Sequence, residues 1–200
     1  MWFRSTYANE LAVLSAWLVV FIPWNISRRS SISTPLGEGE FSMLSLQLPL
    51  FELQFRDEVA VIGDAGVDVS AELSGTELAG NVFITSGPTS ATFYDSTLQY
   101  ASLLWSVASV ALGLALVLSL LLYFREERVE QALPRPPVRV MGALLAVGAL
   151  GTAGASVLYV FERDVVGVPI PIGVLVIAAL AVVLLRTEPV DAETTEHADA

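Results

Sequence analysis

The chain has 200 residues, of which 54% are hydrophobic and only 16% charged, a composition too apolar for an ordinary soluble domain. Its basic residues are all arginines, and 21 acidic residues bring the formal net charge to −11, which excludes a nucleic-acid partner because that binding needs clustered positive charge. Cysteine is absent, so disulfides, zinc–thiolate sites and thiol catalysis are excluded, and the single histidine, His197, has no neighbouring ligand with which to hold a metal.

The first apolar run covers residues 11–26 and has aromatic residues on both sides, of the kind that anchor helices at membrane interfaces. It is short and contains Pro23. A cleaved signal peptide and a re-entrant segment are the alternatives; Arg4 followed by a short apolar run is typical of a signal sequence. No pair of small residues marks a cleavage site after Ile22, so we predict a retained transmembrane helix within residues 1–26.

Residues 27–96 hold ten carboxylates and three arginines, and apolar and polar residues alternate in this region over 44–48 and 53–55. Such alternation predicts half-buried strands, and glycines and prolines separate the candidates. We predict a small antiparallel sheet, with a poorly ordered loop as the alternative. Its acidic residues suggest a weak cation site, but their spacing fits no calcium loop and we interpret them as solvated: Glu52, Asp57, Glu58, Asp64 and Asp68.

Three later segments, residues 98–124, 140–161 and 165–185, contain no charged residue. A helix needs about 20 apolar residues to cross a hydrocarbon core of about 30 Å, so each segment is long enough. Backbone groups in lipid must pair within their own segment, which favours helices. We therefore predict transmembrane helices over residues 97–124, 140–161 and 165–185, the last with Pro169 and Pro171 in its first turn.

The arginines set the predicted orientation. Residues 125–139 hold four of them, so this connector is predicted to be cytoplasmic, which places both termini inside and residues 27–96 outside. Residues 186–200 hold five carboxylates and no apolar run, and we predict an acidic disordered tail. The predicted fold class is an all-α integral membrane protein of the plasma membrane, with four transmembrane helices and a small β-rich extracytoplasmic insertion.

The predicted helices contain no charged residue and no histidine, the groups that form proton relays and metal or haem sites in membranes. We therefore assign no catalytic, cofactor-binding or metal-binding residue and expect no enzyme. Small and hydroxylated residues recur at helical spacing instead: Ser102, Ser106, Ser109, Gly113, Gly148, Gly151 and Thr152. We interpret them as helix packing, with a homo-oligomer interface or a serine-lined polar path as the alternative.

The N-terminal run Arg-Ser-Thr-Tyr-Ala-Asn-Glu-Leu-Ala-Val-Leu-Ser-Ala-Trp-Leu of residues 4–18 is followed by an acidic loop and three uncharged segments. This layout resembles uncharacterised multi-spanning membrane proteins of halophilic archaea. The excess of acid and the lack of lysine agree with that resemblance, although a GC-rich genome also favours arginine over lysine. The resemblance implies a membrane location and a halophilic source, and it carries over no activity.

We expect a non-enzymatic interaction or accessory protein that resides in the lipid bilayer, with a membrane-protein partner or a second copy of itself. The expectation rests on two observations. The predicted helices lack reactive side chains, and two long polar segments, residues 27–96 and 186–200, could serve as contact surfaces. The alternative hypothesis is an oligomeric channel or facilitator for a small uncharged solute, built along the serines of residues 97–124. Neither hypothesis involves a cofactor.

Overall fold

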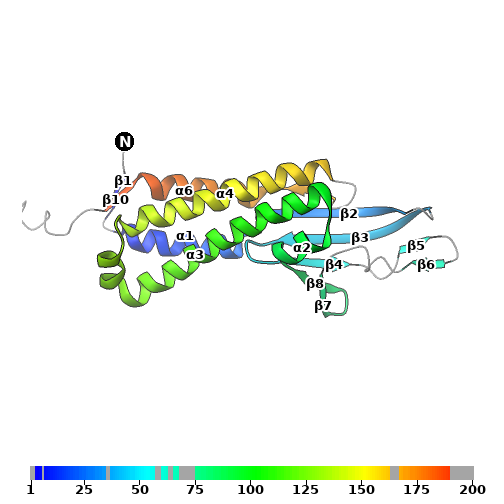
Figure 1. Ribbon diagram of the computed structural model, residues 1–200, viewed down its shortest axis with the longest axis horizontal. Helices are drawn as coiled ribbons and strands as arrows, with labels where there is room; N and C mark the ends of the chain where they lie inside the picture. The colour runs from blue at the N-terminus through cyan, green and yellow to red at the C-terminus, as the bar shows by residue number, and fades with distance from the viewer. Residues whose placement is uncertain are drawn as a thin grey trace, which may run out of the picture.

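The computed structural model describes residues 3–5, 7–34, 37–56, 60–62, 65–67, 75–162 and 167–189. Within them the protein is mixed α/β, with helices at one end and a six-stranded antiparallel sheet at the other (Figure 1). The prediction of an all-α protein with four transmembrane helices is therefore wrong. Asp57, Glu58, Asp64, Asp68 and His197 lie outside the described residues.

The described residues contain four long helices and one short one: α1 (Ala8–Phe21), α2 (Gly87–Phe93), α3 (Ser96–Ala132), α4 (Pro137–Phe161) and α6 (Ile172–Arg186). Of these described helices, only α3 and α4 are long and apolar enough to cross a membrane. With 14 and 15 residues, α1 and α6 reach about 21 and 22 Å at about 1.5 Å per residue, which is less than a hydrocarbon core of about 30 Å.

Prolines explain why the two terminal helices are shorter than their apolar segments. Helix α1 ends at Phe21, shortly before Pro23. In the last apolar segment, Pro169 and Pro171 lack the N–H that a helix interior needs. The chain forms strand β9 (Val168–Ile170) there instead, and α6 begins only at Ile172. An uncharged stretch of sufficient length was thus no proof of one continuous helix.

The large sheet has the strand order β7–β8–β4–β3–β2–β9, and every neighbouring pair is antiparallel. Its remaining strands are β2 (Asn25–Thr34), β3 (Gly37–Gln47), β4 (Glu52–Arg56), β7 (Thr76–Ala79) and β8 (Val82–Thr85). Strand β9 joins this sheet from between α4 and α6, a pairing the sequence analysis did not foresee. Two short pairs complete the described strands: β1 (Phe3–Ser5) with β10 (Thr187–Pro189), and β5 (Ala60–Ile62) with β6 (Ala65–Val67).

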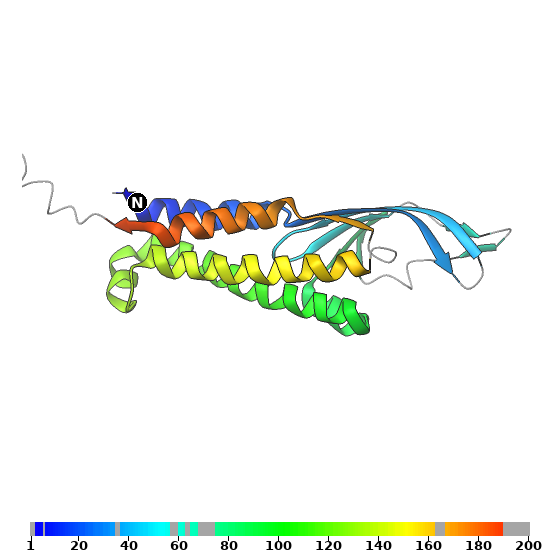
Figure 2. The same ribbon diagram turned by 90° about the horizontal axis from the view of Figure 1, so that it is seen from above.

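Two layers run along the molecule. Helix α1 leads into β2 and β9 leads into α6, so α1, α6 and the sheet form one layer, while α3 and α4 form the other (Figure 2). The layers pack through one buried core whose largest side chains include Trp24, Trp105, Leu112, Met141 and Ile177. Helices α3 and α4 therefore lie along both the short helices and the near part of the sheet.

The connection between α3 and α4 is shorter than the predicted connector of residues 125–139. Helix α3 continues to Ala132, with a break at Arg125, whose φ of −149° and ψ of 46° are not helical. Pro136 and Pro137 then start α4. The predicted tail also begins with structure, because residues 187–189 form β10 beside β1.

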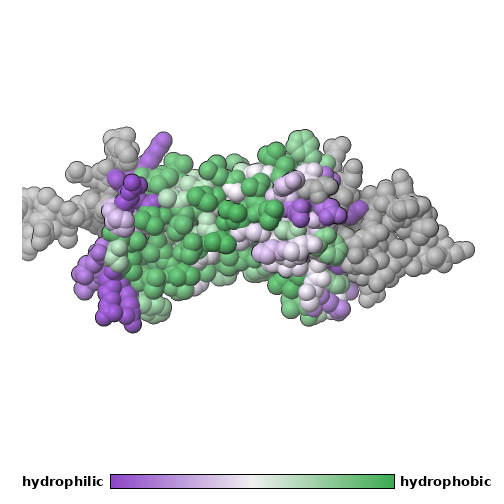
Figure 3. All heavy atoms as spheres, viewed as in Figure 1, coloured by the Kyte–Doolittle hydropathy of each residue, from purple (hydrophilic) through white to green (hydrophobic). Residues whose placement is uncertain are grey.

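Apolar side chains cover the middle of the helical part, and polar ones gather at its ends (Figure 3). Large apolar side chains that are between 63% and 75% exposed come from all four long helices and include Leu14, Phe21, Val110, Leu150 and Leu175. We call this surface the apolar belt. It is far more continuous than the scattered apolar residues of a soluble surface.

Candidate functional site

The sheet is inverted with respect to an ordinary amphipathic sheet, in which the apolar face is buried. In β4 the side chains of Glu52, Gln54 and Arg56 are buried, whereas that of Phe55 is 40% exposed. Strand β3 repeats the pattern: Ser45 and Gln47 are buried, and Leu44 is exposed although both of its neighbours in the strand are buried. The inner face of the sheet, toward α2 and α3, is therefore polar.

Five of the inner side chains form one hydrogen-bonded polar row across β2, β3 and β4. Asn25 Nδ2 donates to Gln47 Oε1 at 2.8 Å, and Gln47 Nε2 donates to Glu52 Oε2 at 3.3 Å. From the other side, Gln54 Nε2 donates to Glu52 Oε1 at 3.0 Å. Arg56 Nε donates to Gln54 Oε1 at 3.1 Å, which ends the polar row on a positive charge.

The Glu52 carboxylate is the final acceptor of the polar row: two amides donate to it, and the other two donors bond to those amides. Burial raises the pKa of Glu52 above its ordinary value, and hydrogen bonds from Ser45, Gln54 and Gln47 and the charge of Arg56 act in the opposite direction. The Arg56 guanidinium also lies 4.0 Å from the centre of the Phe83 ring. The polar row contains one acid and one base that are hydrogen-bonded through amide side chains, so its arrangement suits strand attachment better than proton transfer.

Three buried aromatic residues lie between the polar row and the helices. The ring of Trp24 lies 6.2 Å from that of Trp105 and 6.1 Å from that of Tyr159, and all three side chains are buried. We call these residues the aromatic cluster. Two buried atoms in this region have no hydrogen-bond partner among the described residues: Trp24 Nε1 and Asn25 Oδ1. In the same part of the chain, no three His, Asp or Glu residues could together hold a metal ion.

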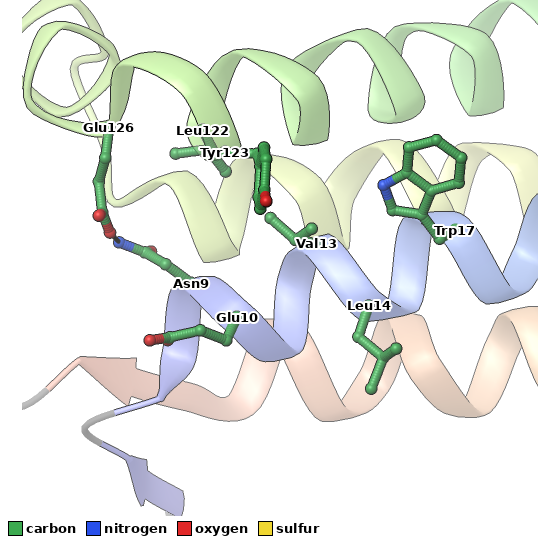
Figure 4. A pocket seen from close by; sticks show the side chains of 8 residues that line it. All are labelled: Asn9, Glu10, Val13, Leu14, Trp17, Leu122, Tyr123 and Glu126. Carbon is green, nitrogen blue, oxygen red and sulfur yellow. Dashed lines mark hydrogen bonds between the residues drawn. The ribbon is translucent and has the colours of Figure 1, made fainter.

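A groove lies between α1 and α3 at the end away from the sheet, and its volume is about 380 Å³ (Figure 4). Its walls are apolar and its rim is polar; the lining residues are Asn9, Glu10, Val13, Leu14, Trp17, Leu122, Tyr123 and Glu126. Asn9 Nδ2 donates to Glu126 Oε1 at 2.7 Å and to Glu130 Oε1 at 2.8 Å, which ties α1 to the last turns of α3. The groove belongs to the apolar belt and carries no set of reactive groups.

The predicted serine stripe of α3 is covered from within the chain. Ser106 Oγ donates to the carbonyl of Ser102 at 2.7 Å, and a Cβ at Gly87 would lie only 2.7 Å from Ser106 Oγ, so α2 packs directly on this serine. Ser109 Oγ donates to the carbonyls of Trp105 and Pro49. Gly113 faces Leu50, whose Cδ2 would be 3.7 Å from a Cβ there. We therefore base no solute path on this stripe.

The small residues of α4 lie against α3 of the same chain. A Cβ at Gly148 would overlap the Leu112 side chain, and one at Gly151 would lie 2.9 Å from the Cβ of Ala108. Thr152 Oγ1 donates to the Gly148 carbonyl at 2.9 Å. These positions let α3 and α4 approach closely. The structure thus brings the small residues of α4 to the α3–α4 interface, and the serines of α3 to the contact with α2 and Pro49.

The polar row is the feature that sequence reasoning missed. Alternation in β3 and β4 showed that the two faces differ, but it does not tell which face is buried. A signal was present in Glu52, Gln54 and Arg56, which stand at every second position and can pair with one another along a strand.

The chain belongs to a family of unknown function (DUF7549), which it matches over residues 1–189. No curated protein matches the chain. Membership therefore brings no activity with it, and a function has to be argued from the geometry.

Proposed function

We propose that the protein is an integral membrane protein that acts as a non-enzymatic interaction or accessory protein. Its helices lie in the bilayer, and most of its sheet stands in the aqueous compartment as the contact surface for a partner. The apolar belt carries this proposal, because exposed side chains such as Leu150 and Leu175, 75% and 74% exposed, come from helices at the surface of the same bundle. Such a surface is stable when lipid covers it.

The arginines support an orientation with the helical end inside the cell. Arg128 and Arg135 flank the turn between α3 and α4, and Arg139 and Arg186 stand at the ends of α4 and α6 on the same side. The start of α1 also lies there (Figure 1). Cytoplasmic loops of membrane proteins carry an excess of arginine and lysine, which favours cytoplasmic termini and an extracytoplasmic sheet in the plasma membrane.

The polar row supports a structural use of the buried charges. Amide groups hold both charges in place: Gln47 of β3 donates to Glu52, which joins β4 to β3, and Gln54 lies between Glu52 and Arg56 within β4. A buried network of this kind gives a sheet one defined geometry at the end of the helices. A rigid sheet on a membrane anchor fits a contact surface better than it fits a catalytic site.

Strand β7 is the part of the sheet best placed for a partner. It is the edge strand, and all four of its residues, Thr76 to Ala79, are exposed, with Leu78 62% exposed. A free edge offers unpaired N–H and C=O groups to an added strand. The opposite edge, β9, contains Pro169, which has no N–H to offer. We therefore place the partner contact on β7.

Affinity purification of the tagged full chain from its own membranes, in mild detergent and high salt, tests the proposal. We expect a partner at constant stoichiometry that the Leu78→Arg variant loses. The matched control is Phe93→Arg, an exposed apolar residue of α2 that is 47% exposed, and this variant should keep the partner. A preparation without a stoichiometric partner, or a partner that both variants retain equally, contradicts the proposed contact.

A further inference from the structure

Building on the proposed membrane location, we infer that part of the sheet lies in the bilayer. The outer face of its strands nearest the helices contacts the lipid of the sheet-side leaflet, and the turn of residues 48–51 between β3 and β4 re-enters the hydrocarbon core. The sheet is thus an extension of the lipid-facing surface, and only its distal part stands in water.

The long helices set the level of the sheet-side boundary. Arg139 near the start of α4 and Arg125 in α3 mark the charged end of the bundle, and Tyr159 and Trp105 each lie 20 residues from them. Twenty residues of helix rise about 30 Å, the thickness of a hydrocarbon core. Tyr159 and Trp105 both belong to the aromatic cluster, so two independent counts place the boundary at the aromatic cluster.

The short helices give the same level by a different route. From Glu10 to Phe21, α1 rises about 17 Å, so about 13 Å of core remains for the chain that follows. Extended chain rises about 3.3 Å per residue, which brings the boundary to about Asn25. Counting back from Arg186 through α6 leaves about 9 Å, which ends near Pro169. The ladder pairs Ile26 with Ile170 and Ser27 with Pro169, so the two counts end within two residues of each other, on either side of the Ile26–Ile170 pair.

The outer face at this level is apolar across five strands. Cross-strand pairing places side chains on a common face and defines what we call the first outer row: Ile170, Ile26, Leu46, Leu53 and Ile84. The next row lies two residues further from the helices and contains Arg28 among apolar neighbours. A positive charge about 7 Å beyond the first outer row is where lipid headgroups would meet it.

The turn of residues 48–51 lies on the helix side of the aromatic cluster. The Pro49 carbonyl accepts hydrogen bonds from Trp105 Nε1, at 3.2 Å, and from Ser109 Oγ. Leu50 faces Gly113, which is eight residues, or about 12 Å, deeper in α3 than Trp105. Backbone outside a helix is tolerated at such depth only when protein satisfies it, and these donors do so for Pro49.

Lipid is the occupant that the continuity of the surface favours. The first outer row continues the exposed faces of α1 and α6, where Phe21 and Ile172 are 68% and 57% exposed, and Figure 2 shows the two helices and the sheet in one layer. Ile170 of the row is itself 51% exposed. A protein that covered this row would also have to cover helices in the bilayer, whereas lipid covers both without a change of surface.

The natural chain has no cysteine, so single cysteines can carry an environment-sensitive NBD fluorophore. We would reconstitute three labelled variants of the full chain in vesicles of phosphatidylcholine and phosphatidylglycerol: Leu53→Cys on the first outer row, Leu150→Cys in the apolar belt and Thr92→Cys on the exposed side of α2. Nitroxide-labelled lipids, with the nitroxide near the headgroup or deep in the chain, report lipid contact, and iodide reports contact with water.

For Leu53→Cys we expect blue-shifted emission that loses most of its intensity to the shallow nitroxide, less to the deep one and little to iodide. Leu150→Cys should respond most to the deep nitroxide, and Thr92→Cys to iodide alone. If iodide quenches Leu53→Cys as strongly as Thr92→Cys, or if neither lipid nor iodide reaches it, the row is covered by water or by protein and the inference is wrong.

The same measurements separate this inference from the proposed function. If Leu150→Cys is quenched by lipid and Leu53→Cys is not, the protein is a membrane protein whose whole sheet lies outside the bilayer. If Leu150→Cys also escapes the nitroxide lipids, the membrane location itself is wrong. A second label at Ile84→Cys, on another strand of the first outer row, must give the result of Leu53→Cys, which guards against a local disturbance of β4.

Discussion

Trp24 stacks on Tyr159, with ring centroids 6.1 Å apart and planes 17° from parallel. This contact joins the short link after α1 to the last turns of α4, and so fastens the sheet layer to the long helices. The backbone N–H of Trp24 also donates to the carbonyl of Gln47 at 2.8 Å, directly below the polar row. The junction between helices and sheet is thus held by a ring contact and a backbone hydrogen bond, and most of our predictions concern it.

The buried carboxylate predicts a dependence of stability on pH. Because burial raises the pKa of Glu52 in the folded protein, the folded state takes up a proton as the pH falls through that raised pKa, while the unfolded state takes it up only near the ordinary value of 4.5. The contribution of Glu52 to the free energy of unfolding therefore rises as the pH falls toward 4.5 and is constant below it, with a slope of at most about 1.4 kcal/mol per pH unit.

Chemical unfolding of the wild type and of Glu52→Gln in detergent, from neutral pH down to pH 4.5, measures this contribution. We expect the wild type to gain stability relative to the variant as the pH falls. Glu77→Gln, which removes an exposed carboxylate from the same sheet, controls for the change in net charge. A difference between wild type and Glu52→Gln that does not change with pH would show that the buried group does not titrate as described.

The Pro49 carbonyl predicts an effect of Ser109 that its neighbour Ser106 does not share. Ser109→Ala removes one of the two donors to this buried carbonyl, and we expect a loss of about 1 kcal/mol in the free energy of unfolding. Ser106 donates only to its own helix, at the Ser102 carbonyl, so Ser106→Ala should cost less. Equal losses in the two variants, measured by chemical unfolding in the same detergent, would contradict the role we assign to Ser109.

Two glycines make a matched pair for close contacts of helices: Gly173 of α6, which faces the link after α1, and Gly113 of α3. A Cβ at Gly173 would overlap the Pro23 carbonyl and lie 2.6 Å from Trp24 Cα, and backbone cannot turn aside as a side chain can. Gly173→Ala should therefore destabilise by about 1–3 kcal/mol. At Gly113 a Cβ meets only Leu50 Cδ2 at 3.7 Å, so Gly113→Ala should be neutral or stabilising, because alanine favours a helix. Melting temperatures of both variants check the pair; a Gly173→Ala variant as stable as the wild type would refute the close approach.

The sequence allowed the general layout to be predicted, with apolar helices around a β-rich middle, because uncharged length and alternation are local signals. It did not reveal the class of the fold, because β9 is three residues within an uncharged segment and forms only by pairing with β2. The prolines at 169 and 171 indicated a break in the helix, but they were equally compatible with the first turn of a helix. The alternation of polar and apolar residues around Glu52 likewise showed that the strand has two different faces, but it did not show which face the helices would cover.

Extraction of the full chain from its own membranes with alkaline carbonate tests most directly the claim that the apolar belt lies in lipid. We expect the protein to stay with the membrane pellet after carbonate and after urea and to be released only by detergent. Release into the carbonate supernatant would show that lipid does not cover side chains such as Leu150 and Leu175, and both the membrane location and the lipid contact of the sheet would then be wrong.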